Sequence, residues 1–276
     1  MRSPTIDHPV VASSAVTREA EIPICSAQSC REHDSGRLVW KVPCTIELQM
    51  GVSVQTAKKP YNIHAMLRRI RLEVKQFADA AMFDLAEQGY ATAFHQLVAC
   101  IISVRTRDEV SLPTAIRLFE MAPTAQAISR MRVAQIAEVI RASTFYETKA
   151  HNIHALAKRV AEEYHGNLPC DFEVMTSFRG VGPKCANLTL GIACGATEIS
   201  VDVHVDRVTN RWGYVQTSSP DATRVALENK LPTKYWVEIN RLLVPFGKHV
   251  CTGRLPKCSR CPVLEYCRQV GVTEQR

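Results

Sequence analysis

The stretch "FRGVGPKCANLTLGIACG", residues 178–195, puts two glycines, a proline and a lysine at the start of an amphipathic helix. Pro183 suits the first helical position, because its missing N–H is one that a helix leaves unpaired there. Lys184 suits the next position poorly, since a helix N-terminus carries about half a positive charge and favours anions. A cation at this helix end therefore needs another explanation.

The two glycines lie between the helical segments "DFEVMTSF" (171–178) and "PKCANLTLGIAC" (183–194). Paired glycines allow a tight turn that points N–H groups outward at a helix N-terminus, an arrangement that binds phosphate. An isolated G-x-G is more often a plain turn. Between two helices, Gly180 and Gly182 predict a helix–hairpin–helix that binds a DNA backbone without reading its sequence.

Outward from this hairpin, apolar residues recur at helical spacing from about residue 62. The segments with this spacing are 62–77, 93–106, 132–143, 150–165, 200–214 and 235–247. We expect Pro113, Pro123, Gly166 and Pro220 to separate helices. No segment alternates as a strand does, so the pattern predicts an all-α protein made of many short helices.

Composition limits the class of protein. The 276 residues are 46% hydrophobic and 22% charged, as in soluble globular proteins, and the net charge of +7 fits an anionic partner such as nucleic acid. No segment reaches the ~18 apolar residues of a membrane span. The N-terminus resembles neither a signal nor a transit peptide, so we expect an intracellular protein.

Residues 1–60 show no sustained periodicity and predict a disordered N-terminal extension. It holds Cys25, Cys30 and Cys44 at irregular spacing, which favours free thiols. Structural disulfides are rare inside cells, so we do not expect the eleven cysteines to form them. A cluster of cysteines indicates a metal site instead.

Four cysteines near the C-terminus form such a cluster. Cys251, Cys258, Cys261 and Cys267 are spaced C-x6-C-x2-C-x5-C. Four thiolates in a small loop suit tetrahedral zinc, although zinc sites are usually built from two short-spaced pairs. An unequal run on one loop also suits a [4Fe–4S] cluster, each iron taking one sulfur. The spacing favours iron–sulfur over zinc.

The same loop carries Arg254 and Lys257. Held by a bound cluster, the loop could present both cations to a phosphate backbone. The alternative is a solvated charged loop.

Lys184 has two interpretations: a phosphate contact, or a nucleophile whose pKa the helix dipole lowers, since only a neutral amine attacks carbon. Asp202 stands at the predicted N-cap of the helix in "SVDVHVDRVTNRWGY", residues 200–214. It could serve as a cap alone. Ionised and near the lysine, it could also stabilise a developing cation.

Together, "GVGPKCAN" (180–187), "VDVHVDRV" (201–208) and the cysteine loop resemble endonuclease III, the helix–hairpin–helix DNA glycosylases with an iron–sulfur cluster. The resemblance runs from about residue 65 to 268. It implies two helical domains flanking a DNA-binding groove. These would be a six-helix barrel at 86–196, holding the hairpin, and a discontinuous cluster domain at 61–85 and 197–276.

The resemblance also implies residue roles. Lys184 matches the family's nucleophile, Asp202 its catalytic aspartate and the four cysteines its cluster ligands. In "IISVRTRDEV" (101–110), Arg105 replaces the glutamine that commonly fills the gap left by a flipped nucleotide. In "STFYETK" (143–149), Phe145 replaces a wedge leucine. Both types of side chain can enter a base stack; the alternative is a surface charge and a core phenylalanine.

We therefore expect a monomeric glycosylase and AP lyase that acts on oxidised pyrimidines or abasic sites in double-stranded DNA. One alternative is a mismatch or adenine glycosylase of the same fold. Another is a non-catalytic, redox-sensing DNA-binding protein, although binding alone requires neither Lys184 nor Asp202.

Overall fold

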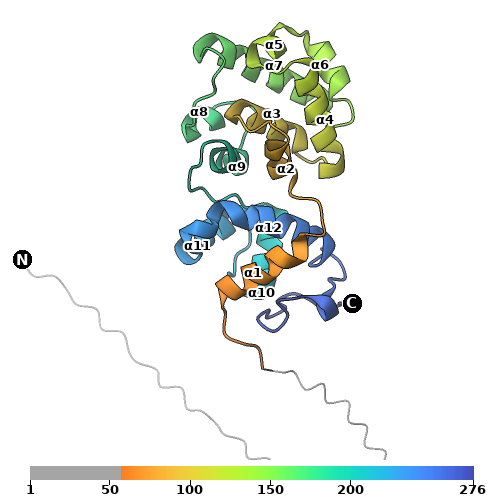
Figure 1. Ribbon diagram of the computed structural model, residues 1–276, viewed down its shortest axis with the longest axis vertical. Helices are drawn as coiled ribbons and strands as arrows, with labels where there is room; N and C mark the ends of the chain where they lie inside the picture. The colour runs from red at the N-terminus through yellow and green to blue at the C-terminus, as the bar shows by residue number, and fades with distance from the viewer. Residues whose placement is uncertain (1–56) are drawn as a thin grey trace, which may run out of the picture. The chain divides into compact units, whose positions relative to one another are not determined.

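The computed structural model describes residues 57–276, and every regular element in that range is a helix (Figure 1). The prediction of an all-α protein is confirmed for this part of the chain. The expected N-terminal extension lies outside the described residues except for 57–60, as do Cys25, Cys30 and Cys44. None of the helices in 57–276 combines the length and the apolar composition that a membrane crossing requires.

Most of residues 57–276 lie in twelve α-helices joined by loops, with two short 3₁₀ turns. Their bounds are α1 Ile63–Val74, α2 Ala81–Glu87, α3 Ala93–Ser103, α4 Asp108–Met121, α5 Ala125–Arg130, α6 Val133–Val139, α7 Tyr146–Glu163, α8 Phe172–Thr176, α9 Pro183–Ala193, α10 Val203–Trp212, α11 Pro220–Lys230, η1 Thr233–Tyr235, α12 Trp236–His249 and η2 Cys258–Arg260.

Two of the four residues that we expected to separate helices lie within helices instead. Pro123 and Gly166 do lie between helices, but Pro220 is the first residue of α11 and Pro113 lies inside α4. Proline is favoured at the first helical position. Pro113 removes one backbone hydrogen bond near the start of α4, and the helix continues because its buried face, including Leu118 and Phe119, packs on the core.

A first hydrophobic core gathers side chains from α2 to α9, with one from α12. Leu85, Leu97, Phe119 and Ile128 are among its largest fully buried members. In α3 nine residues are buried, because α4 and α9 pack on its two sides. These helices occupy the upper part of Figure 1.

A second core combines α1 with the C-terminal part of the chain. Met66 and Ile70 of α1 are fully buried in it with Val205, Trp212 and Phe246. Helices α1, α10, α11 and α12 form the lower part of Figure 1, although more than a hundred residues of the first core separate α1 from the others in sequence. The chain therefore crosses between the two cores after α1 and again after α9.

A disulfide joins Cys170 and Cys194, with 5.9 Å between their Cα atoms. The expectation that no cysteine forms a disulfide is therefore wrong for this pair. Cys170 lies just before α8 and Cys194 directly follows α9, so the bond closes the base of the helix–hairpin–helix. The two thiols meet because α8 and α9 pack against each other.

We expect replacement of both partners by serine (Cys170→Ser with Cys194→Ser) to destabilise the protein by ~3 kcal/mol through the lost loop constraint. That corresponds to a melting temperature lower by roughly 6–12 °C. Thermal melts followed by circular dichroism, without reductant, measure the change. Equal melting temperatures for wild type and variant would show that the disulfide does not stabilise the hairpin.

Candidate active site and DNA-facing surface

The turn between α8 and α9 leaves its backbone open. Gly180 has φ +88°, and a Cβ there would lie 2.7 Å from Asn152 Nδ2, so no other residue fits without strain. Gly182 has ordinary φ, and nothing in the structure lies within 4 Å of the position of its missing Cβ. Within residues 57–276, the N–H groups of Gly180, Gly182 and Lys184 donate no hydrogen bond. The turn presents unpaired donors at a helix N-terminus.

Lys184 is the second residue of α9 and is half-buried. It lines a cleft of about 640 Å³ together with Asp202 and Arg105. Its Nζ forms no hydrogen bond or ion pair with any residue in 57–276. The amine is therefore available to a molecule that enters the cleft.

Asp202 reaches the same cleft from the other core. It is the N-cap of α10, and its Oδ1 accepts hydrogen bonds from the backbone N–H groups of His204 (3.0 Å) and Val205 (2.9 Å). Its Oδ2 accepts none in the described part of the chain. The residue thus caps its helix and also keeps one carboxylate oxygen without a partner.

The expected lowering of the pKa of Lys184 is wrong. Burial does lower this pKa, but electrostatic interactions with the Cys100–Cys185 pair, Asp202 and Asp108 together outweigh it, and the pKa lies above its ordinary value. The helix N-terminus was visible in the sequence, whereas Cys100, Asp202 and Asp108 come close to Lys184 only on folding. The resting lysine is therefore an ammonium.

Two buried thiols account for part of this effect. Cys185 follows Lys184 on α9, and Cys100 lies on the adjacent helix α3. A hydrogen bond with Cys100 lowers the pKa of Cys185 to about 6, and the same bond raises that of Cys100. Cys185 is the thiolate of the pair and carries a negative charge beside the lysine. Neither cysteine stands out in the sequence.

Arg105 and Phe145 meet at the edge of the cleft. The guanidinium carbon of Arg105 lies 5.3 Å from the centroid of the Phe145 ring. Both residues have left-handed backbones, with φ of 54° and 58°. Phe145 is 58% exposed, so it is not a core residue. The structure brings these two predicted side chains together on the surface.

Other residues of the cleft were not singled out from the sequence. Lys248 of α12 forms an ion pair of 2.7 Å with Asp108, the first residue of α4. His204 packs on α12 at Gly247, where a Cβ would lie 2.8 Å from its Nδ1. Burial lowers the pKa of His204. Because Lys248 and Asp108 are 140 residues apart in sequence, their pairing could not be predicted from it.

The four C-terminal cysteines are free thiols that line one cavity. Burial raises the pKa of Cys261 to about 12 and that of Cys267 to about 11. Among residues 57–276, no three His, Cys, Asp or Glu side chains converge closely enough to hold a metal ion. The four thiols thus line a common cavity.

The loop between these cysteines is held by α10. Arg211 donates to the carbonyl oxygens of Thr252 (2.5 Å) and Gly253 (2.6 Å). Arg254 is exposed and Lys257 half-exposed; neither forms an ion pair with residues 57–276. These two cations lie outside the cleft of Lys184, as do Gly180 and Gly182.

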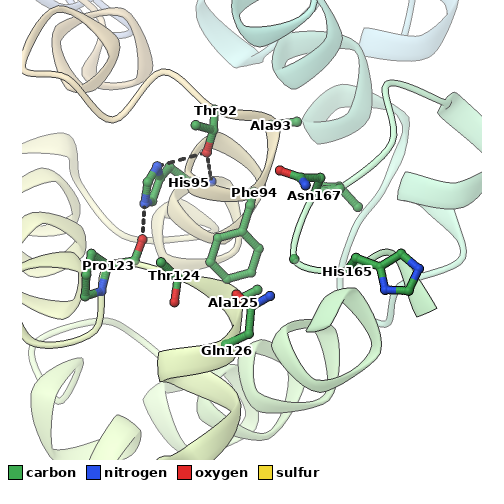
Figure 2. A pocket seen from close by; sticks show the side chains of 12 residues that line it. Thr92, Ala93, Phe94, His95, Pro123, Thr124, Ala125, Gln126, His165 and Asn167 are labelled. Atoms are coloured by element: carbon green, nitrogen blue, oxygen red, sulfur yellow. Dashed lines mark hydrogen bonds between the residues drawn. The ribbon is translucent and has the colours of Figure 1, made fainter. Parts of the chain in front are cut away.

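A second cavity, of about 360 Å³, lies between the start of α3, the start of α5 and the loop after α7 (Figure 2). None of the catalytic, DNA-binding or metal-binding residues predicted from the sequence lines it. Figure 2 shows His95 bonded through one ring nitrogen to Thr92 and through the other to Pro123 O. Since both ring nitrogens have partners, this histidine joins two helix starts and has no free nitrogen for a ligand.

Comparison with known proteins agrees with this geometry. Residues 98–233 match the model of the HhH-GPD superfamily base excision DNA repair protein. The Thermotoga maritima protein "Endonuclease III" is 33% identical over 174 residues, 63% of this chain and 82% of the relative. The Gallus gallus "Endonuclease III-like protein 1" is 33% identical over 220 residues, 76% of this chain and 78% of the relative.

Two solved structures share the fold over 75% of this chain and 94% of theirs. A non-covalent endonuclease III–DNA complex superposes with a TM-score of 0.66 at 27% identity. A trapped endonuclease III–DNA covalent intermediate gives 0.64 at 26% identity. With an open hairpin turn, a free lysine amine and a capping aspartate in the matching segments, the chain belongs to the endonuclease III family of base excision DNA repair proteins.

Proposed function

We propose that this protein is a bifunctional DNA glycosylase and AP lyase that releases oxidised pyrimidines from double-stranded DNA inside the cell. Its family makes it a base excision repair glycosylase. The lysine chemistry is our inference. It rests on one observation above all: the unpaired amine of Lys184 shares a cleft with the carboxylate of Asp202.

The substrate must enter the cleft as a single nucleotide. A base inside a duplex is out of reach of Lys184, so the nucleotide is flipped out, at a cost of a few kcal/mol that is least for a damaged base. Arg105 and Phe145 stand exposed at the edge of the cleft, and we assign them to the gap that the nucleotide leaves.

In the first step the Lys184 Nζ electron pair attacks C1′ of the sugar. The C1′–N bond breaks, and the base departs with the electron pair. Positive charge develops on the sugar, and the Asp202 carboxylate offsets it. Ring opening gives a Schiff base between Nζ and C1′. Loss of a C2′ proton then expels the 3′ phosphate by β-elimination and nicks the strand.

Before the attack, the ammonium of Lys184 must lose a proton. Because its pKa is raised, the neutral amine is a minor form at neutral pH, and its share grows as the pH rises. Asp202, through its free Oδ2, or the thiolate of Cys185 can accept this proton. Activity limited by the attack therefore increases with pH.

We assign binding of the DNA backbone to two further surfaces, the hairpin turn and the cysteine loop. The unpaired N–H groups of Gly180 and Gly182 suit a phosphate oxygen, and the open space at Gly182 lets a backbone approach. Arg254 and Lys257 carry unpaired charge on the cysteine loop, which suits a second phosphate contact.

Replacement of Arg254 and Lys257 by alanine should weaken binding to all duplex sequences alike and make its salt dependence shallower. We expect the slope of log K against log [salt] to fall by ~1 for each lost phosphate contact. Fluorescence anisotropy across a salt series measures it, with Lys158→Ala, at an exposed lysine of α7, as the control. An unchanged slope, or loss limited to some sequences, would contradict the assignment.

We further propose that Cys251, Cys258, Cys261 and Cys267 hold a [4Fe–4S] cluster. The donor set fits it, since all four are free thiols around one cavity and Arg211 donates to Cys251 Sγ at 3.6 Å, as suits a thiolate. When bound, the cluster supplies a rigid crosslink of the loop that carries Arg254. The alternative is zinc, held by the same thiolates.

Protein purified without oxygen should be brown, absorb near ~400 nm and contain iron in place of zinc, as four thiolates around an iron–sulfur cluster would give. Metal analysis with absorption spectroscopy checks this. One zinc and no iron per chain would overturn the assignment.

We propose two domains, a helical barrel around the first core and a cluster domain around the second. Ala81, Phe83 and Leu85 pack in the first core, so we assign α2 to the barrel and put the first boundary before it, in place of residue 85. Lys58 and Lys59 contact the cysteine loop through Leu264 and Glu265, which supports joining the segment before α1 to the cluster domain.

The function is tested on duplexes that each carry one thymine glycol, one abasic site or one mismatch, scored for base release, nicking and borohydride trapping. We expect release, nicking and a covalent adduct on the thymine glycol duplex. Base release from a mismatch without an adduct would favour the mismatch or adenine glycosylase. Binding without any of the three reactions would favour a non-catalytic DNA-binding protein.

A further inference from the structure

Lys149 is a buried cation that has no carboxylate partner among residues 57–276. It lies on α7, one turn after Phe145, and is only 5% exposed. Its Nζ donates to the carbonyl oxygens of Ile102 and Val104, each at 2.7 Å. Burial lowers the pKa of Lys149 to about 8, so it is still mostly an ammonium at neutral pH.

The two carbonyls belong to the end of α3. The last carbonyls of a helix lack intrahelical partners and carry partial negative charge, so a cation there is favourable. Lys149 therefore caps α3 from another helix. It fixes the point at which the chain leaves α3 toward Arg105.

The same ammonium binds the loop that leads to Phe145. Its Nζ also lies 2.8 Å from Ser143 Oγ and 3.1 Å from Thr106 Oγ1, so its three N–H groups are shared among four acceptors. Thr106 Oγ1 also accepts from the Thr144 N–H at 3.1 Å, and Ser143 Oγ donates to Ile102 O at 2.9 Å. One amine thus joins residues 102–106 to residues 143–144.

Each of these two loops carries one left-handed residue with an exposed side chain: Arg105 and Phe145. Left-handed backbone is unfavourable for both residue types, so the loops hold it only because neighbouring groups fix them. The hydrogen bonds that cross between the loops all involve Lys149 or the two hydroxyls that it binds.

We propose that Lys149 is a positioning residue, which holds Arg105 and Phe145 together in the geometry that enters the duplex when a nucleotide is flipped out. This inference rests on the proposed function, and in particular on the assignment of those two side chains to the gap. Lys149 itself touches neither DNA nor the reacting atoms.

The test compares a substrate that needs the two loops with one that does not. The first is a duplex with an abasic site opposite 2-aminopurine, whose fluorescence rises when the base is unstacked. The second is a single-stranded oligonucleotide with an abasic site, which has no stack to enter. Lys149→Met removes the ammonium at similar length, and Lys158→Met, on the exposed side of α7, is the matched control.

We expect Lys149→Met to slow single-turnover nicking of the duplex by about 10- to 100-fold, the cost of small misplacement. It should also remove the 2-aminopurine signal while single-stranded nicking changes less than about twofold. Lys158→Met should match wild type on both. Equal losses on both substrates would indicate a merely structural role, and unchanged duplex nicking would also overturn the inference.

Thr106→Val with Ser143→Ala keeps the lysine and removes its hydroxyl acceptors, so it tests the same link should Lys149→Met fail to fold. The same duplex-specific loss is expected, and its absence overturns the inference. Arg105→Ala with Phe145→Ala separates the two proposals. If this variant is impaired while Lys149→Met is not, only the positioning role fails. If it nicks the duplex normally, the gap assignment fails and the positioning role with it.

Discussion

Lys184→Gln should neither release thymine glycol nor form a borohydride-trapped adduct, with excision reduced by on the order of 10⁴ or more. Glutamine keeps much of the length and polarity of the side chain but has no amine to attack C1′. The hairpin N–H groups and the two exposed loops remain, so the variant should still bind damaged duplex. Gel-based release and trapping, with anisotropy for binding, measure these results.

The control for folding is the metal content and the melting temperature of the variant, which should match wild type. Lys248 is the other lysine of the cleft, and its ion pair with Asp108 occupies its amine. If Lys184→Gln still forms an adduct, then another amine is the nucleophile, and Lys248→Gln becomes the decisive variant.

Asp202→Asn should slow excision by about 10²–10³-fold, the usual effect of losing one charge at a pre-organised site. Asparagine is as good a helix N-cap as aspartate, and its Oδ1 can still accept from the N–H groups of His204 and Val205. The substitution therefore removes the charge and keeps the cap. Single-turnover base release from a thymine glycol duplex measures the loss.

Nicking at a preformed abasic site should be largely retained in Asp202→Asn, because the base has already left and Lys184 can attack the open aldehyde. Asp221→Asn, at the N-terminus of α11 and away from the cleft, makes the same charge change and should behave as wild type. Excision at the wild-type rate by Asp202→Asn would mean that this carboxylate only caps its helix.

The hairpin and its helices were predictable because their signals are local. Gly180 lies in a left-handed turn and Pro183 at a first helical position, both of which a short stretch of sequence determines. The prediction that Pro113 separates two helices was wrong because it also used only local sequence. The packing that lets α4 continue past Pro113 comes from other helices. Helices α2 and α5 were not among the predicted segments, nor were α4 and α11, where Pro113 and Pro220 were interpreted as breakers.

The electrostatics of the cleft were not predictable, because they depend on residues that only the fold brings together. The pKa of Lys184 reflects Cys100 and Asp108, which are about eighty residues away in sequence. The bond between Cys170 and Cys194 also follows from packing. The burial of Lys149 was visible in the sequence pattern, because this lysine falls at an apolar position of α7, on the same face as Ile153 and Leu156.

The two cores have a consequence for catalysis. Lys184 starts a helix of the first core and Asp202 a helix of the second, and the chain passes between them only at residues 75–80 and 194–202. The distance between amine and carboxylate therefore depends on how the two cores are joined, not on either core alone. Asn187 Nδ2 donates to Ile199 O at 3.2 Å and Ser200 Oγ to Lys184 O at 3.2 Å, so the second passage is tied to α9. Substitutions at Asn187 or Ser200, which do not line the cleft, should therefore change the reaction rate by shifting Asp202 relative to Lys184.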